Sequence, residues 1–258
     1  MVGRNGFGWD TPASRVPLPQ VGEMTAMSGQ PRITILCGHY GCGKTNLALN
    51  LALEETPCTL ADLDVVNPYF RSSEYEDLLT GHGVKVIKPV FAGTTLDTPT
   101  LSPALFSLFD ESAGRVLIDA GGDDAGVTAL GGLSEQLRES GYEMLYVINR
   151  NRVLSQKPED AAALLREIEA ASRLKATGIV NNTHLGVQTD FTTLLEGLPF
   201  AQRTAELCDL PLLYSTAPDF AVPAGERLPQ GFKMIRRLVK FVWEQEETLP
   251  EHPGNERI

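Results

Sequence analysis

The residues with the clearest chemistry form a glycine-rich loop at positions 38–45, with the letters GHYGCGKT. The loop fits the phosphate-binding pattern GxxxxGK[ST], in which backbone N–H groups turn toward phosphate oxygens and a helix N-terminus adds positive potential. Lys44 would reach the β- and γ-phosphates, and the Thr45 hydroxyl would ligate Mg²⁺. We expect the nucleotide contacts to come from Gly38, Gly41, Cys42, Gly43, Lys44, Thr45 and Asn46. The alternative is a strand–helix turn that holds no ligand.

A pair of aspartates follows the second apolar run of the sequence. Asp62 and Asp64 alternate onto the same face of an extended strand, and Asp64 lies at its carboxyl end. A carboxylate there could orient a Mg²⁺-bound water or the water that attacks the γ-phosphate. The alternative is that an aspartate caps a turn ahead of Asn67 and Pro68.

The segment 115–118, apolar after Arg115, is also followed by an aspartate, Asp119, and then by a glycine-rich turn. An apolar strand ending in Asp is typical of the Walker B carboxylate, which holds Mg²⁺ through water. Gly122 would let a backbone N–H approach the γ-phosphate and move when that phosphate leaves. We expect Asp123 and Asp124 to face solvent or cap a helix.

Asparagines stand at a third strand end, Asn181 and Asn182. An asparagine amide at this edge can both accept from and donate to an adenine ring. An Asx turn explains the pair equally well. Residues 215–219, which follow the next strand, are a weaker candidate for a wall of the base pocket.

The elements that position these residues alternate along the chain. Strands are predicted at 32–37, 58–63, 84–88, 115–120, 143–148, 176–181 and 211–216. Helices are predicted at 44–55, 71–80, 103–110, 127–140, 158–173, 190–208 and 230–246. This alternation predicts an α/β protein with a three-layer P-loop NTPase fold, whose mostly parallel central sheet is flanked by helices. We expect a loosely ordered arm at 1–30, the NTPase domain at 31–247 and a tail at 248–258.

Composition narrows the functional classes. The net charge of −11 argues against general nucleic-acid binding, because phosphate contacts need clustered Lys and Arg. No apolar run is long enough to cross a bilayer, no signal peptide is evident, and the cysteines show no CxxC spacing, so we expect a cytoplasmic protein.

The predicted last helix is basic and amphipathic, but the glutamates after it would repel anionic lipid. We therefore expect it to cover the sheet rather than bind a membrane.

Together the segments GHYGCGKT, LADLDVVNP, VLIDAGGDDAG and IVNN resemble the CobQ/CobB/MinD/ParA nucleotide-binding domain proteins, in the SIMIBI branch of P-loop NTPases. The resemblance covers about residues 32–245. It implies that Gly43, Lys44 and Thr45 bind phosphates and Mg²⁺. It also implies Asp64 as the switch I aspartate, Asp119 as Walker B, Gly122 at switch II, and Asn182 or Asn181 on adenine.

One departure concerns His39. Many of these ATPases carry a lysine at this position, which reaches across a dimer to the partner's nucleotide. Imidazole is shorter and largely neutral near pH 7, so His39 cannot serve as the permanent cation that the sandwich-dimer mechanism uses. Arg150 or Arg152 could supply the missing charge, with solvated loop arginines as the alternative. Cys42 is a possible redox or metal-sensing position, although a small residue there commonly just fits between glycines.

These features predict a Mg²⁺-dependent ATPase that acts as a nucleotide-dependent switch on a partner protein, with slow turnover when alone. Lys44 and Asp64 would be its catalytic residues. A homodimer is possible. The alternatives are an ATP-dependent ligase or amidase of the same fold that activates a small carboxylate, and a nucleotide-binding module with little turnover. A substrate pocket of the ligase would involve residues such as Asp97, Thr98, Asp123 or His184.

Overall fold

A computed structural model of the chain describes residues 31–63, 75–88, 103–122 and 124–239. Its strands are β1 (Ile33–Cys37), β2 (Cys58–Leu63), β3 (Val84–Ile87), β4 (Arg115–Ala120), β5 (Tyr142–Ile148), β6 (Gly178–Asn181), β7 (Leu212–Pro218) and β8 (Phe232–Ile235). Its helices are α1 (Lys44–Glu54), α2 (Glu76–Gly81), α3 (Pro103–Phe106), α4 (Asp124–Gly132), α5 (Ser134–Ser140), α6 (Pro158–Ser172) and α7 (Phe191–Cys208).

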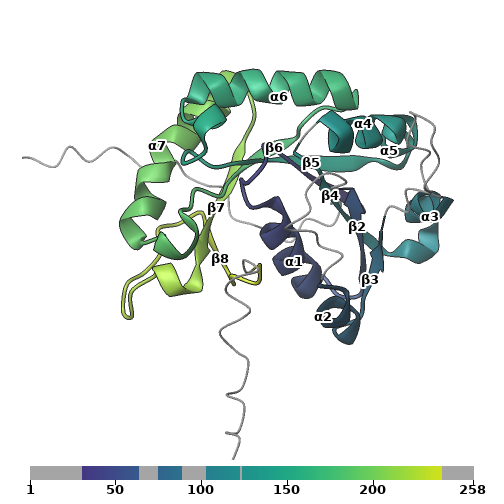
Figure 1. Ribbon diagram of the computed structural model, residues 1–258, viewed down its shortest axis with the longest axis horizontal. Helices are drawn as coiled ribbons and strands as arrows, with labels where there is room; N and C mark the ends of the chain where they lie inside the picture. Colours follow the sequence, from purple (N-terminus) through teal and green to yellow (C-terminus); the bar gives the residue numbers. More distant parts are fainter. Residues whose placement is uncertain (1–30, 64–74, 89–102, 123, 240–258) are drawn as a thin grey trace, which may run out of the picture.

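The strands form one sheet in the order β3-β2-β4-β1-β5-β6-β7-β8, and every neighbouring pair is parallel. Figure 1 shows α4, α5 and α6 above this sheet and α1 and α2 below it. The arrangement confirms the predicted three-layer α/β fold of P-loop NTPases. Strand β1 lies between β4 and β5, where the winding of the chain changes direction, and ligands of open parallel sheets bind at such a point.

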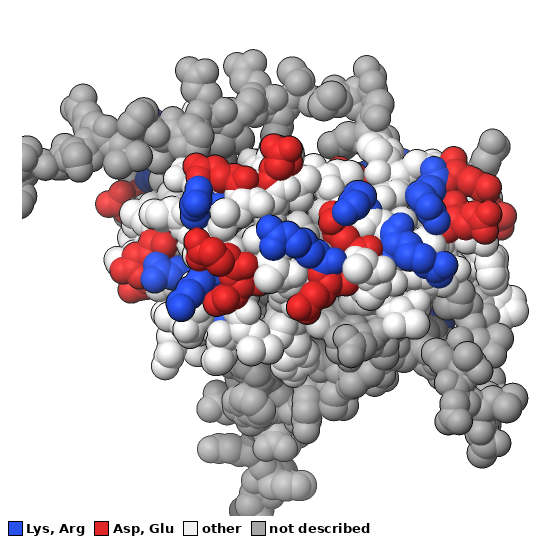
Figure 2. Space-filling model, turned by 90° about the horizontal axis from the view of Figure 1, so that it is seen from above, with Lys and Arg blue, Asp and Glu red and all other residues white. Residues whose placement is uncertain are grey.

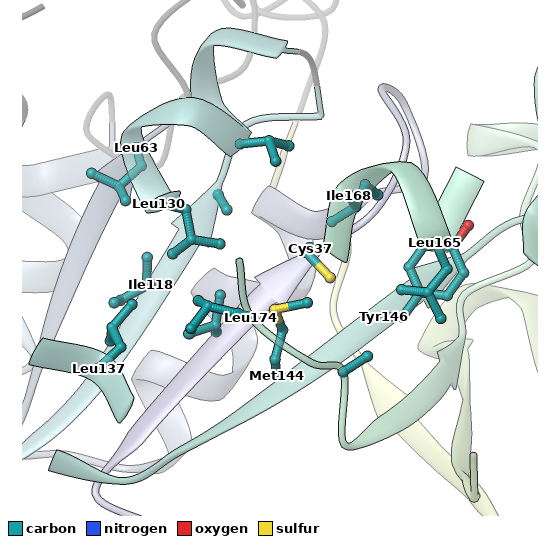
Figure 3. Packing of buried hydrophobic residues seen from close by; sticks show 14 of the residues in the cluster. Cys37, Leu63, Ile118, Leu130, Leu137, Met144, Tyr146, Leu165, Ile168 and Leu174 are labelled. Carbon is teal, nitrogen blue, oxygen red and sulfur yellow. The ribbon is translucent and has the colours of Figure 1, made fainter. Parts of the chain in front are cut away.

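Alternation along the strands divides the core into two layers. Ile33, Ile35 and Cys37 of β1 pack on the α4–α6 side, and Figure 3 shows Cys37 there with Ile118, Leu130 and Leu165. Leu36 points to the other side, where Leu47 and Leu51 of α1 pack. Successive side chains of a strand point to opposite faces of the sheet, so residues two positions apart pack against the same helix layer.

Every predicted strand is present, and most predicted helices are found within a few residues of their expected bounds. The helix expected at 127–140 is divided into α4 and α5 at Leu133. The helix expected at 103–110 is shortened to α3 followed by a 3₁₀ turn at Ser107–Phe109. The predicted arm at 1–30 and tail at 248–258 lie outside the described residues.

The helix predicted at 230–246 is wrong over its described part. Residues Phe232–Ile235 form strand β8, which pairs in parallel with β7 through partners such as Ala217 and Met234. Helical spacing of the apolar residues suggested otherwise, but pairing with an available sheet edge overrides a local pattern of this length. Residues 240–246 lie outside the described part.

Charges on the helical surface are mixed in sign. Figure 2 views the molecule from the α6 side, where Lys and Arg side chains alternate with Asp and Glu rather than forming one basic field. Within the described residues, no helix combines the length and the apolar character that crossing a bilayer requires.

Candidate nucleotide-binding site

The glycine-rich loop joins β1 to α1, as the sequence predicted. Gly43 immediately precedes α1 with φ of 87°, a left-handed conformation that glycine adopts without strain. A Cβ atom at this position would overlap Nδ2 of Asn182 and lie 3.0 Å from Nε2 of His184. Glycine is therefore required both by the backbone conformation and by the two side chains that approach the loop.

Lys44 curls back over its own loop. Its Nζ donates to the carbonyl oxygens of Gly38 at 3.0 Å and His39 at 3.3 Å, and the side chain is buried. The Nδ1 of His39 meanwhile donates to the carbonyl of Tyr40 at 2.9 Å, so the imidazole is held within its own loop. The loop carbonyls thus hold the ammonium group in place, where its positive charge would help to neutralise a bound anion.

Asn182 ties β6 to the loop. Its Nδ2 donates to the carbonyl oxygen of Cys42 at 2.7 Å, and its Oδ1 accepts from the hydroxyl of Thr216. Both polar ends of this buried amide are therefore engaged by the protein. The predicted adenine contact of Asn182 remains a prediction, but the observed role is to hold the peptide between Cys42 and Gly43.

Asn181 has a different environment. Its Nδ2 donates to Ser215 at 3.0 Å, and its Oδ1 accepts from the backbone and hydroxyl of Thr183. The contact with Thr183 matches the Asx-type alternative considered from the sequence. Its binding of adenine also stays a prediction.

The candidate metal ligand Asp119 lies on β4, and its predicted Walker B role stays a prediction. It is fully buried near the end of β4, in register with Leu36 of β1 and Asp62 of β2. Asp119 and Leu117 are two positions apart in β4, so their side chains point to the same face of the sheet, the face that α1 covers. Asp64 and Asp123 lie outside the described residues.

Gly122 connects the loop after β4 with the phosphate loop. A Cβ atom on Gly122 would lie 2.5 Å from the backbone nitrogen of Tyr40 and 2.9 Å from the carbonyl oxygen of Gly38. Only glycine permits so close an approach of two backbones. Because the two backbones are in contact, a movement of either loop would displace the other.

A cleft of about 250 Å³ opens above the phosphate loop. Its floor comes from the loop, and its walls come from the segments that follow β5, β6, β7 and β8. The lining comprises Tyr40, Gly41, Gly43, Lys44, Thr45, Asn46, Arg152, Asn182, His184, Gly186, Pro218, Phe220, Ile235, Arg237 and Val239. Among these described residues Lys44, Arg152 and Arg237 are cationic and none is acidic, although the whole chain carries −11. The cleft therefore favours an anion with an apolar portion.

His184 is a neutral group in this cleft. Burial, aided by the positive charges of Arg152 and Arg237, lowers its pKa from 6.5 to about 4. The backbone N–H of Gly186 donates to its Nδ1 at 3.1 Å, so the proton of the neutral ring is on Nε2. That nitrogen faces the loop at Gly43, and a hydrogen bond to the Cys42 backbone partly opposes the fall in pKa.

Two asparagines of α1 hold the segment after β8. Nδ2 atoms of Asn46 and Asn50 donate to the Arg236 carbonyl at 3.0 Å and 2.9 Å, and Asn50 Oδ1 accepts from the Arg236 N–H at 2.8 Å. Asn46 Oδ1 also accepts from the N–H groups of Leu238 and Val239. Both polar atoms of the Asn46 side chain thus bind this segment. The predicted contact of Asn46 with nucleotide would have to come from its backbone.

The thiol of Cys42 lacks the properties of a reactive position. The residue is buried, and burial raises the pKa of its thiol, although Lys44 and Arg152 partly oppose this. A protonated, enclosed thiol is inert toward oxidants and metals. The alternative from the sequence, a small side chain that fits between glycines, agrees with the structure.

The chemistry of the donor set fits Mg²⁺. The described residues contain no group of three or more His, Cys, Asp or Glu side chains that would form a metal cage. Mg²⁺ is usually bound by one or two protein oxygens together with phosphates and water. Thr45, which lines the cleft, and the buried Asp119 of β4 are the described residues that would hold the ion.

No protein-family model and no curated protein matches this sequence. Among solved structures, the signal recognition particle 54 kDa protein from Aeropyrum pernix K1 in complex with GDP has 19% identity and a TM-score of 0.48. The match covers 78% of this chain and 43% of that one. Chloroplast FtsY from Physcomitrella patens has 18% identity and a TM-score of 0.49, with 75% and 60% covered. FtsY from Thermotoga maritima has 16% identity and a TM-score of 0.48, with 75% and 64% covered.

This chain therefore spans 43–64% of the length of these neighbours. These neighbours belong to the SIMIBI branch of P-loop NTPases, and none of the three is a CobQ/CobB/MinD/ParA protein. At these identities and scores the likeness concerns the fold and carries no argument about activity.

Part of the cleft was missed by sequence reasoning. Ile235, Arg237 and Val239 line it, but they fell within a helix that the sequence wrongly predicted. A usable signal was present in α1, where Asn46 and Asn50 stand four residues apart and enclose the apolar residues Leu47, Ala48 and Leu49. A buried amide requires polar partners, so two asparagines on this face of the helix indicate a polar segment packed against it.

Proposed function

We propose that this protein is a Mg²⁺-dependent ATPase with slow basal turnover, which acts as a nucleotide-dependent switch on a partner protein. The observation that carries the proposal is the cleft above the phosphate loop, where Lys44, Thr45 and Arg152 meet an apolar wall. A triphosphate chain matches its cationic floor. A nucleobase matches the wall that includes Pro218 and Phe220.

In the proposed reaction, water adds to the γ-phosphorus and the bond to the β,γ-bridging oxygen breaks, giving ADP, phosphate and a proton. Proteins accelerate this reaction mainly through positioning and charge stabilisation. Lys44 would stabilise negative charge on the β- and γ-phosphates, and Asp64 would orient the water. Thr45 and Asp119 would hold Mg²⁺, which supplies further neutralisation of phosphate charge when bound.

Adenine is the proposed base. Guanine presents two N–H donors on its pairing edge, which a carboxylate accepts well, and no carboxylate is present among the described residues that line the cleft. The sequence resemblance also favours ATP. We therefore expect ATP to bind at least about tenfold more tightly than GTP, a difference of about 1.4 kcal/mol.

A switch needs a connection between the nucleotide and a surface. Gly122 provides contact between the loop after β4 and the phosphate loop. Large apolar side chains are exposed on loops at the same edge of the sheet, namely Tyr40, Val153, Leu154, Leu185, Val187 and Phe220. Apolar groups gathered near a ligand site favour a protein partner, which includes a second copy of the chain.

The test is binding of ATP to the purified chain by calorimetry, with and without Mg²⁺. Wild type should bind in a Mg²⁺-dependent manner, and Lys44→Ala should weaken binding at least about a hundredfold, or 2.7 kcal/mol. Absence of binding by wild type, or unchanged binding by Lys44→Ala, would overturn the proposal. Slow hydrolysis that a small carboxylate stimulates, rather than a protein, would favour the ligase instead.

A further inference from the structure

Two arginines in the loop after β5 have different surroundings. Arg150 points to α7, where its Nη1 donates to the Glu196 carbonyl at 2.8 Å and lies 3.6 Å from the Glu196 carboxylate. Arg152 instead lines the cleft. Its Cζ and Nε both lie 3.2 Å from the place that a Cβ atom on Gly41 would occupy. The sequence left these arginines as alternatives, and the structure separates them.

Arg152 is a cation whose hydrogen bonds are incomplete. Its Nε is buried without a hydrogen-bond partner, and no ion pair of Arg152 occurs among the described residues. A buried donor without a partner costs about 1–3 kcal/mol, and more when it is charged. An unpaired guanidinium N–H does not stabilise the fold. We therefore expect the hydrogen-bond partner of Arg152 Nε to be a ligand. The partner of a guanidinium is an anion.

The loop that carries Arg152 is held in place. The backbone N–H of Arg152 donates to the Asn149 carbonyl at 3.3 Å, and its carbonyl accepts from Ser155 N–H at 2.9 Å. Ser155 is buried, and its hydroxyl donates to the Asn149 carbonyl at 3.2 Å. The backbone that carries the guanidinium is therefore held in place beside the phosphate loop, which reduces the entropy lost when the side chain binds a ligand.

We propose that Arg152 contacts the phosphate chain of the bound nucleotide and supplies, from the same chain, a second cation beside Lys44. The inference rests on the proposed function. It requires that Arg152 contribute more to binding of a triphosphate than to binding of a nucleoside with fewer phosphates. A planar guanidinium can engage two phosphate oxygens at once, whereas an ammonium acts as a point charge.

The experiment compares Arg152→Ala and Arg152→Lys with the control Arg150→Ala, which removes a cation of the same loop that faces away. Calorimetry measures the affinity of each protein for Mg²⁺-ATP and for AMP. Arg152→Ala should weaken ATP binding about tenfold or more and change AMP binding less, because AMP carries fewer phosphates. Arg152→Lys should fall between, and Arg150→Ala should remain within about twofold of wild type.

Thermal unfolding of each ligand-free variant checks that the fold is kept. If Arg152→Ala does not fold, Arg152→Met, which keeps much of the side-chain length, takes its place. Failure of both to fold would mean that Arg152 is structural and would overturn the proposal. So would ATP binding by Arg152→Ala within twofold of wild type, or equal losses for ATP and AMP.

The two proposals fail in distinguishable ways. If wild type binds ATP and Lys44→Ala does not, an unaffected Arg152→Ala overturns only the role of Arg152. If wild type itself does not bind ATP, the proposed function fails and the role of Arg152 fails with it.

Discussion

The side-chain amide of Asn182 donates to the carbonyl of Cys42 at 2.7 Å and ties the end of β6 to the phosphate loop. In a trans peptide the carbonyl and the next N–H point in opposite directions, so this bond also fixes the direction of the Gly43 N–H. Thr216 fixes the other end of the amide. The direction of this backbone donor is thus set by Asn182, the residue after β6, and by Thr216 of β7.

Replacing Asn182 by Asp tests this relationship with little change in shape. Asp keeps an acceptor for Thr216 but presents an oxygen to the Cys42 carbonyl, where a donor is needed. Because the peptide before Gly43 loses its anchor, ATP affinity should fall about tenfold to a hundredfold, which corresponds to about 1.4–2.7 kcal/mol. Calorimetric titration with Mg²⁺-ATP measures the affinity of each protein. Thr216→Ser, which keeps the hydroxyl, is the control, and equal affinities of Asn182→Asp and wild type would refute the role.

A second prediction concerns Gly43→Ala. The new methyl group would overlap the Asn182 amide, and φ of 87° is unfavourable for alanine. The unfolding free energy should fall by about 1–3 kcal/mol, and ATP binding should be lost. Gly81→Ala in α2 is the matched control, because a Cβ there meets nothing within 4 Å. Denaturant titration measures the unfolding free energy of both variants. Equal values for the two would contradict the predicted clash.

The sequence predicted well those features that depend on local pattern. The apolar runs of β1 and β4 are continuous because both faces of a parallel sheet are buried, and the phosphate loop has a fixed spacing. From these runs followed the fold and the position of Lys44 and Asp119.

The sequence did not predict features that depend on contacts between distant residues. The Cys42 carbonyl and Asn182 are 140 positions apart, so the local pattern around either residue could not reveal the hydrogen bond between them. Arg236 and Asn50 are 186 positions apart, and their hydrogen bonds hold the residue after β8 against α1. Helical spacing alone carries no information about such partners.

The pH dependence of stability provides a third prediction. The pKa of His184 is lowered to about 4 in the folded protein, so the unfolded chain binds a proton more readily between pH 6.5 and 4. Its contribution to stability is therefore complete above pH 6.5 and is lost as pH falls toward 4. Wild type should lose up to about 3 kcal/mol more than His184→Asn over this range. Urea titrations of both proteins from pH 8 to 4 measure the difference, and parallel curves would contradict the prediction.

The fourth prediction concerns the clamp between α1 and the segment after β8. Asn50→Ala removes the groups that pair with both the N–H and the carbonyl of Arg236, and it should lower the unfolding free energy by about 2–3 kcal/mol. Hydrogen exchange at the Arg236 amide should accelerate, and ATP affinity should fall because Arg237 and Val239 line the cleft.

The control for this clamp is Glu54→Gln, which removes a partly exposed ion pair between Glu54 and Lys233 that joins α1 to β8. Surface pairs contribute little, so this change should cost less than about 0.5 kcal/mol and leave the Arg236 amide protected. Equal exchange at Arg236 in Asn50→Ala and wild type would mean that β8 alone holds the segment. In that case the paired asparagines of α1 would not be what positions Arg237 beside the nucleotide.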